Sequence, residues 1–316
     1  MSLSMDHGIT FFAILGPALA ATINAGTPLM LAAFGLLLNE KAGVLNLGAE
    51  GMMLLAAIAG FAVTVGTGSA TLGFVSGAAA GMVAAAFFGW MVLWLGTNQY
   101  ATGLALSIFG GGLSAFAGIP YTGLSLPGYK LWIPVLSDLP YVGAVLFRHH
   151  PLVYVALLIC AALAWFLTRT RAGLVLRAVG ESPESAHALG YNVRRIRLAA
   201  VMFGGACCGL AGAYLAVVYT PMWQEGMTAG KGWIALALTT FACWKPWRVV
   251  AGAYLFGGVT ILQLNLQSLG VAVAPQIMAM LPYVATIVVL ALISRNPHWI
   301  RLNIPASLGK YFNPHA

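Results

Sequence analysis

Long apolar stretches recur along this chain and constrain its fold more than any other feature. Only 7% of the 316 residues are charged, whereas soluble domains carry about a quarter. A helix of about 20 apolar residues crosses the hydrocarbon core of a bilayer. A membrane β-barrel would instead need short segments of alternating polarity. The sequence therefore predicts an all-α, polytopic transmembrane bundle that forms a single domain over residues 1–316, and it excludes a soluble globule.

The apolar runs predict about nine membrane spans. Pro17 and Pro28 lie inside the first, which predicts a tilt or a kink. Two spans carry small-residue pairs, Gly77 with Gly81 and Gly205 with Gly209, that predict close helix approach. The expected spans are residues 9–38, a second ending near 66, 71–95, a fourth ending near 118, 151–167, 198–220, a short one at 233–244, 249–269 and 275–294.

A polar run at 169–197 interrupts the apolar pattern and fixes the orientation. It holds six of the fifteen basic residues, and basic loops are retained on the cytoplasmic side. With nine spans, the N-terminus then lies outside, the C-terminus inside and the loop 119–150 outside. This arrangement places twelve of the fifteen basic residues inside. Lys130, Arg148 and Lys231 are expected outside.

A short helix is predicted within this run, at residues 183–189. Ser182 suits the N-cap, Pro183 the first helical position, and Glu184 the positive end of the helix dipole. Gly190 is a suitable terminator. The helix would expose Ala188 and Leu189 between arginines, and we interpret it as a docking element for a cytoplasmic partner.

No constellation of catalytic or metal-binding residues emerges from the sequence. The segment GMTAGKGW, residues 226–233, lacks the spacing and the hydroxyl residue of a phosphate-binding loop. The formal charge of +8 follows membrane topology and is not interpreted as nucleic-acid binding. Ion-driven carriers usually need ionisable groups within their spans. Such groups are scarce here, so the driving force for transport is expected from another protein.

Four polar residues are candidates for lining a solute path: Asn46, Glu50, Asn98 and Gln99. Asn46 and Glu50 are four apart and would share one helical face. Two roles are open for Glu50, a polar lining of the path or a charge that favours the start of the next helix. Asn98 and Gln99 either line the path or form a turn.

Four separated segments together resemble one known family. They are NEKAGVLNLGAEGMMLLAA (39–57), LRAVGESPESAHALGYNV (176–193), WQEGMTAGKGWIALAL (223–238) and LQLNLQSLGVAVAPQIMAMLPY (262–283). They resemble permease subunits of bacterial ABC importers, in the nucleoside-uptake branch related to simple-sugar and branched-chain amino-acid permeases. The resemblance implies a permease fold of the ribose and vitamin B12 type. It also implies that the region around Glu50 belongs to a discontinuous helix near the translocation path.

The resemblance further implies a division of labour among subunits. The loop from Glu181 to Gly190 would be the coupling helix that inserts into a cytoplasmic ABC ATPase, which would hold ATP and Mg; this chain would need no cofactor. The other partners would be a second, unlike permease and an extracytoplasmic substrate-binding lipoprotein, at the bacterial plasma membrane. A simple-sugar permease is the alternative within the class. An ion-coupled secondary carrier is the alternative outside it.

Overall fold

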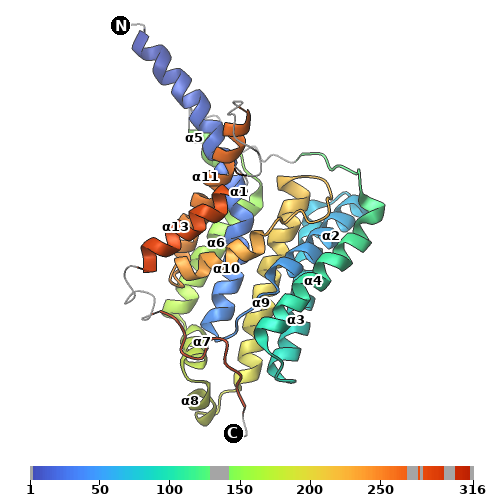
Figure 1. The fold of residues 1–316 in the computed structure, drawn as a ribbon, viewed down its shortest axis with the longest axis vertical. Coiled ribbons are helices and arrows are strands. Elements are labelled where there is room, and N and C mark those ends of the chain that lie inside the picture. Colours follow the sequence, from blue (N-terminus) through green and yellow to red (C-terminus); the bar gives the residue numbers. More distant parts are fainter. Residues whose placement is uncertain (1–2, 129–141, 269–276, 278–279, 295–302, 314–316) are drawn as a thin grey trace.

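The structure, a computed structural model, describes residues 3–128, 142–268, 277, 280–294 and 303–313. Its helices pack as a bundle with the N-terminus and the C-terminus at opposite ends (Figure 1). Seven are long: α1 (Leu3–Lys41), α2 (Ala49–Thr67), α3 (Ala70–Leu93), α4 (Gln99–Gly118), α6 (Pro151–Arg169), α9 (Val193–Tyr214) and α11 (Pro246–Ser268). The shorter ones are α5 (Val142–Leu146), α7 (Arg171–Glu181), α8 (Pro183–Ala188), α10 (Lys231–Phe241) and α13 (Leu281–Ser294), with single turns at Ile119–Tyr121 and Leu215–Tyr219.

The predicted count of nine spans is not confirmed. Within the described part of the chain, 7 helices are long and apolar enough to cross a membrane. The predicted span at 233–244 corresponds to α10, whose 11 residues reach only about 16 Å at 1.5 Å per residue. That is about half of a bilayer core. The last predicted span, 275–294, overlaps α13, which has 14 residues, and most of 269–279 lies outside the described residues.

The first predicted span is one helix despite its two prolines. Pro17 and Pro28 both lie inside α1. From Ala25 to Leu38 this helix is almost wholly buried, because α9, α10 and α11 surround it. Large apolar side chains remain exposed on the outer helices, among them Ile108 and Phe116 of α4 and Leu158 of α6. An exposed apolar exterior around a buried central helix is the arrangement that a lipid environment favours.

The two predicted glycine pairs face each other. A side-chain carbon at Gly81 would collide with the carbonyl oxygen of Gly205, and one at Gly209 would collide with that of Gly77. Helices α3 and α9 therefore approach backbone to backbone, as the spacing of these glycines predicts. This contact joins α9, at the centre, to the layer formed by α2, α3 and α4.

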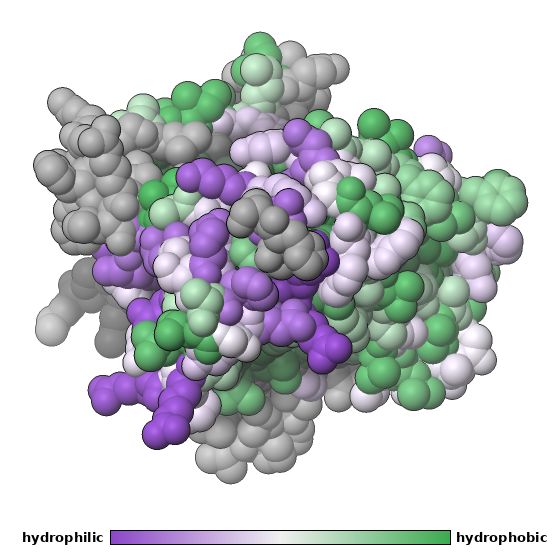
Figure 2. Space-filling view, turned by 90° about the horizontal axis from the view of Figure 1, so that it is seen from below, coloured by the Kyte–Doolittle hydropathy of each residue, from purple (hydrophilic) through white to green (hydrophobic). Residues whose placement is uncertain are grey.

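The end of the molecule that carries the C-terminus is strongly polar. Viewed from that end, hydrophilic side chains gather over the middle while hydrophobic ones cover the right-hand flank (Figure 2). Lys41 at the end of α1 donates to the carbonyl of Asn303 (2.7 Å), so the C-terminal segment packs against the bundle. Further along this segment, the Ser307 N–H donates to the carbonyl of Gly180 (3.0 Å) and the Gly309 N–H donates to that of Gly43 (3.3 Å).

The polar run 169–197 is mostly helical. Besides the predicted short helix, it contains α7, which the charge pattern obscured, and the first turns of α9 with Arg194, Arg195 and Arg197. In the loop 119–150, the described residues form the turn Ile119–Tyr121 and α5. Residues 129–141, with Lys130, lie outside the described residues.

Candidate translocation site

Two short breaks in the helices meet inside the bundle. Residues 42–48 connect α1 to α2 without regular helix, and residues 220–230 connect α9 to α10. As a result α2 begins next to the start of α10: a side-chain carbon at Gly232 would lie within 2.7 Å of the Cα atom of Glu50. In Figure 1, α10 crosses the bundle roughly midway between its two ends. Non-helical backbone at such a depth is tolerated where protein buries it or where it borders a cavity.

Glu50 joins the two helix starts. One of its carboxylate oxygens accepts hydrogen bonds from the Thr228 hydroxyl (2.6 Å) and from the Gly230 N–H (2.8 Å). The other accepts from the Gly232 N–H (2.6 Å). The first N–H groups of a helix have no partner within the helix, and they carry a partial positive charge. Glu50 therefore neutralises the start of α10 while lying in the first turn of α2.

The turn before α10 needs an unusual backbone to present these donors. Ala229 and Gly230 have φ angles of 46° and 79°, in the left-handed region that glycine adopts most readily. Lys231 follows, and its ammonium donates to the carbonyl of Thr228 (3.4 Å). Lys231 was expected in an outside loop; in the structure it is the first residue of α10, and the side of the membrane on which it lies stays a prediction.

A second carboxylate holds the other end of α10. Glu40, in the last turn of α1, is 1% exposed. It accepts hydrogen bonds from the Thr239 hydroxyl (3.0 Å) and the Trp244 indole N–H (2.5 Å). The Lys41 ammonium lies 5.8 Å from the centre of the Trp244 ring, within cation–π range. Both ends of α10 are thus attached to acids that flank the break between α1 and α2.

Two of the predicted path residues are placed as follows. Asn46 lies in the break before α2, where its side-chain oxygen accepts from the Gly48 N–H (2.9 Å) and its nitrogen donates to the Met52 sulfur (3.5 Å). The prediction that Asn46 and Glu50 share a helical face is wrong, because α2 begins only at Ala49. Glu50 lies in the first turn of α2, where an acid favours the start of that helix; its role in lining a path stays a prediction. The helix it hydrogen-bonds is α10, not its own.

The other two predicted path residues lie at the polar end. Asn98 is exposed and caps α4, accepting from the N–H groups of Tyr100 and Ala101. Gln99 is buried; it accepts from the Leu45 N–H (2.8 Å) and donates to the Lys310 carbonyl (3.5 Å). The structure brings Gln99 to the break at 42–48 but does not bring Asn98 there.

The predicted coupling segment forms a protruding arm, defined here as α7 and α8. Ser182 caps α8 as expected, accepting from the Ser185 N–H (3.3 Å). Pro183 occupies the first turn with Glu184, and Gly190, with φ of 88°, follows the helix end. Ala188 is exposed and Leu189 is 79% exposed at the tip. Glu181, at the junction, accepts from the N–H of Ala306 (3.3 Å).

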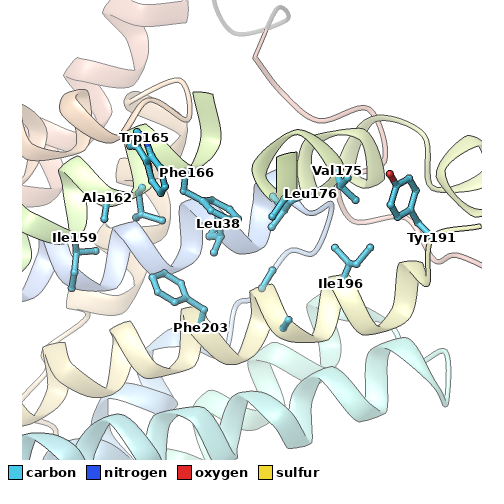
Figure 3. Close-up of a pocket in the computed structure, with 14 residues that line it drawn as sticks. Leu38, Ile159, Ala162, Trp165, Phe166, Val175, Leu176, Tyr191, Ile196 and Phe203 are labelled. Carbon is cyan, nitrogen blue, oxygen red and sulfur yellow. The ribbon is translucent and has the colours of Figure 1, made fainter. Parts of the chain in front are cut away.

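An apolar hollow of about 700 Å³ lies behind the arm, between α6, α7 and α9 (Figure 3). Phe166 of α6, Leu176 of α7 and Phe203 of α9 point toward it from three sides. Leu38 of α1 also borders it. Such a largely apolar wall offers a polar solute few hydrogen bonds, which disfavours this hollow as a route for one. It does leave α7 incompletely packed on its inner side.

The resemblance noted in the sequence is matched by a family model. The model of permease components of branched-chain amino acid transport systems matches residues 18–293. The chain belongs to this family, and it is an ABC transporter permease. The matched region contains both breaks, α10 and the arm. No solved structure matches the chain.

Several relatives of the permease are similar over most of its length. A putative glucose ABC transporter permease of Haloferax volcanii is 41% identical, over 93% of this chain and 97% of its own. A guanosine ABC transporter permease of Bacillus subtilis is 30% identical, over 88% and 92%. A nucleoside ABC transporter permease of Lactococcus lactis subsp. cremoris is 32% identical, over 84% and 88%.

Proposed function

We propose that this permease imports nucleosides by alternating access, driven by a separate ATPase that docks on the arm. The exposed tip of α8 on the polar end carries the proposal, because it is a capped protrusion that ends in the small and apolar residues Ala188 and Leu189. The hollow behind α7 gives the arm room to shift when it is pushed. Alternating access requires two conformations of the bundle, and a helix with free space on one side can pack differently in each of them.

The junction between Glu50 and α10 is the part of the bundle that we expect to move with the path. Two helices that start inside the bundle leave polar backbone groups at depth, which suits the passage of a polar, uncharged solute. Glu50 already accepts three hydrogen bonds. We therefore assign it the role of positioning α10 beside the path, with Asn46 and Gln99 fixing the backbone of the break at 42–48.

The proposed assembly contains subunits besides this chain. A cytoplasmic ABC ATPase would bind ATP and Mg, an extracytoplasmic lipoprotein would deliver the solute, and a second, unlike permease would complete the path in the bacterial plasma membrane. The basic polar end supports a cytoplasmic position for the arm, since positively charged loops are retained on that side. This orientation puts the N-terminus outside and the C-terminus inside.

The similarity to guanosine and nucleoside permeases supports a nucleoside as the solute. A sugar is the second candidate, because a putative glucose permease is 41% identical to this chain. Both kinds of solute are uncharged and rich in hydroxyl groups. Uptake of labelled guanosine into vesicles that carry the whole assembly, with unlabelled uridine, ribose or glucose as competitors, separates them. Competition by glucose or ribose but not by uridine would overturn the nucleoside assignment.

The docking role is tested at the tip of the arm. The double substitution Glu184→Arg with Ala188→Trp reverses a charge and adds bulk at exposed positions, so it should abolish uptake while the protein still reaches the membrane. A matched control adds the same bulk at exposed Ala161 on α6, as Ala161→Trp, away from the polar end. Unchanged uptake by the arm variant would contradict the proposal.

A further inference from the structure

A single buried arginine joins three segments at the polar end. Arg197 of α9 is 1% exposed. Its Nε donates to the carbonyl of Ala42 (3.0 Å), one Nη donates to the Ser307 hydroxyl (2.8 Å) and the other donates to the carbonyl of Lys310 (3.3 Å). A guanidinium carries five N–H donors in a fixed plane, so it can hold several acceptors in one geometry.

Ser307 extends this contact to the arm. Its hydroxyl donates to the carbonyl of Gly180 (2.6 Å), near the end of α7, and its backbone N–H donates to the same oxygen (3.0 Å). The packing here leaves no spare room. A side-chain carbon at Gly43 would lie 2.5 Å from the Ser307 hydroxyl and 2.8 Å from an Nη of Arg197.

The C-terminal segment, residues 305–312, also contacts both sides of this node. Its Phe312 packs in a cluster with Val179 of α7 and Ala186 of α8. On the other side, the Gly309 N–H donates to the carbonyl of Gly43 (3.3 Å). The segment therefore touches the arm and the break at 42–48 at once, and Arg197 lies between them.

We infer that Arg197 and Ser307 are positioning residues that convey displacement of the arm to the break at 42–48 and from there to Glu50 and α10. The physical basis is that α7, the break and the C-terminal segment share one set of buried hydrogen bonds. A displacement of Gly180 then has to shift Ser307, Arg197 and Ala42 together or break those bonds. The inference deepens the proposed function and rests on it, because the arm must receive the push.

The test measures solute moved for each ATP hydrolysed by the whole assembly in vesicles. Arg197→Lys keeps the charge but loses the planar fork, and Ser307→Ala removes the side-chain link to Gly180. Loss of a charged hydrogen bond is worth about tenfold in an equilibrium. We expect solute moved per ATP to fall about tenfold in Arg197→Lys and about threefold in Ser307→Ala, with ATP hydrolysis kept within about twofold. Arg248→Lys, at the same end of the molecule, is the control.

Two outcomes would overturn the inference: an unchanged ratio in both variants, or equal falls in transport and ATP hydrolysis, which would indicate a structural role alone. If Arg197→Lys does not assemble, Ser307→Ala decides. The double variant sharpens the test, since contacts in one chain of bonds are not additive. In the double variant, solute moved per ATP should fall no further than in Arg197→Lys. If the effects of the two substitutions on this ratio multiply instead, the two residues do not act through a shared route. If the proposed function itself is wrong, the result differs: the wild-type permease would bind no ATPase and would show no ATP-driven transport.

Discussion

The Glu50 junction and the arm both place an acid at the start of a helix, yet the two acids do different work. Glu50 is half-buried and accepts three hydrogen bonds at the start of a neighbouring helix. Glu184 is exposed in the first turn of its own helix, α8. The same helix dipole favours both. Water screens the interaction at the arm, whereas protein surrounds it at the junction.

This difference predicts that substitutions at the junction change stability and that substitutions at the arm change function. Breaking a buried interaction leaves donors without partners, which costs free energy beyond the bond itself. An exposed side chain at the tip, such as that of Leu189, contributes little to folding. The free energy of unfolding and the rate of uptake, measured on the same variants, therefore separate the two regions.

The largest loss of stability is expected for Glu50→Ala. The change leaves Thr228, Gly230 and Gly232 without their acceptor, so the free energy of unfolding in mixed micelles should fall by about 3–5 kcal/mol. Glu225→Ala, at an exposed position in the loop before α10, is the control and should change it by less than about 0.5 kcal/mol. Equal effects of the two substitutions would mean that Glu50 does not hold α10.

A smaller loss is expected at the other end of α10. Trp244→Phe keeps most of the ring but removes the indole N–H that reaches Glu40. The free energy of unfolding should fall by about 1–3 kcal/mol, because a buried oxygen of Glu40 loses its donor. Thermal unfolding in detergent, compared with Trp247→Phe at an exposed position on α11, measures it. Equal losses of stability in Trp244→Phe and Trp247→Phe would contradict the prediction that Glu40 holds this end of α10.

A single hydroxyl tests how much of the junction depends on side chains. Thr228→Val removes one of the three bonds to Glu50, while two backbone donors remain. The loss should be about 1–2 kcal/mol, well below that of Glu50→Ala. Thr67→Val, at an exposed position on α2, is the reference, because it makes the same change of side chain without touching Glu50. A loss as large as that of Glu50→Ala would show that the backbone donors contribute nothing.

The smallest change in stability is expected at the tip of the arm. Leu189→Ala removes an exposed side chain, so the free energy of unfolding should stay within about 0.5 kcal/mol. ATP-driven uptake should nevertheless fall severalfold, because the residue would contact the ATPase. Both quantities can be measured on one preparation. A destabilised variant would place Leu189 in the folded core of the assembly rather than at its docking surface.

Patterns that depend on neighbours along the chain were predictable from the sequence. Ser182 and Pro183 are adjacent to the helix they start, and Gly77 with Gly81 repeat on one face, so local rules were sufficient. The apolar runs likewise located the seven long helices. α7 was missed because its arginines match an exposed loop as well as an amphipathic helix.

Contacts between distant residues were not predictable in this way. Glu50 meets Gly232 across more than 180 positions, and Arg197 meets Ser307 across 110. The hydropathy pattern predicted a membrane span at 233–244, because the apolar run continues past the end of α10. The helix in fact ends before Cys243 and Trp244, which have positive φ angles and form a turn. No local signal marked the junction, because the threonine and glycines before α10 are ordinary residues of turns and loops.

The most direct test of the account is site-specific photo-crosslinking from the tip of the arm. A photoreactive residue at position 189 should form an adduct with the ATPase subunit in intact cells, and one at exposed Val83 of α3 should not. The adduct should also weaken when Glu184→Arg is introduced. Crosslinking of position 189 to extracytoplasmic proteins, or to no nucleotide hydrolase at all, would contradict the proposal that the permease is driven through this arm.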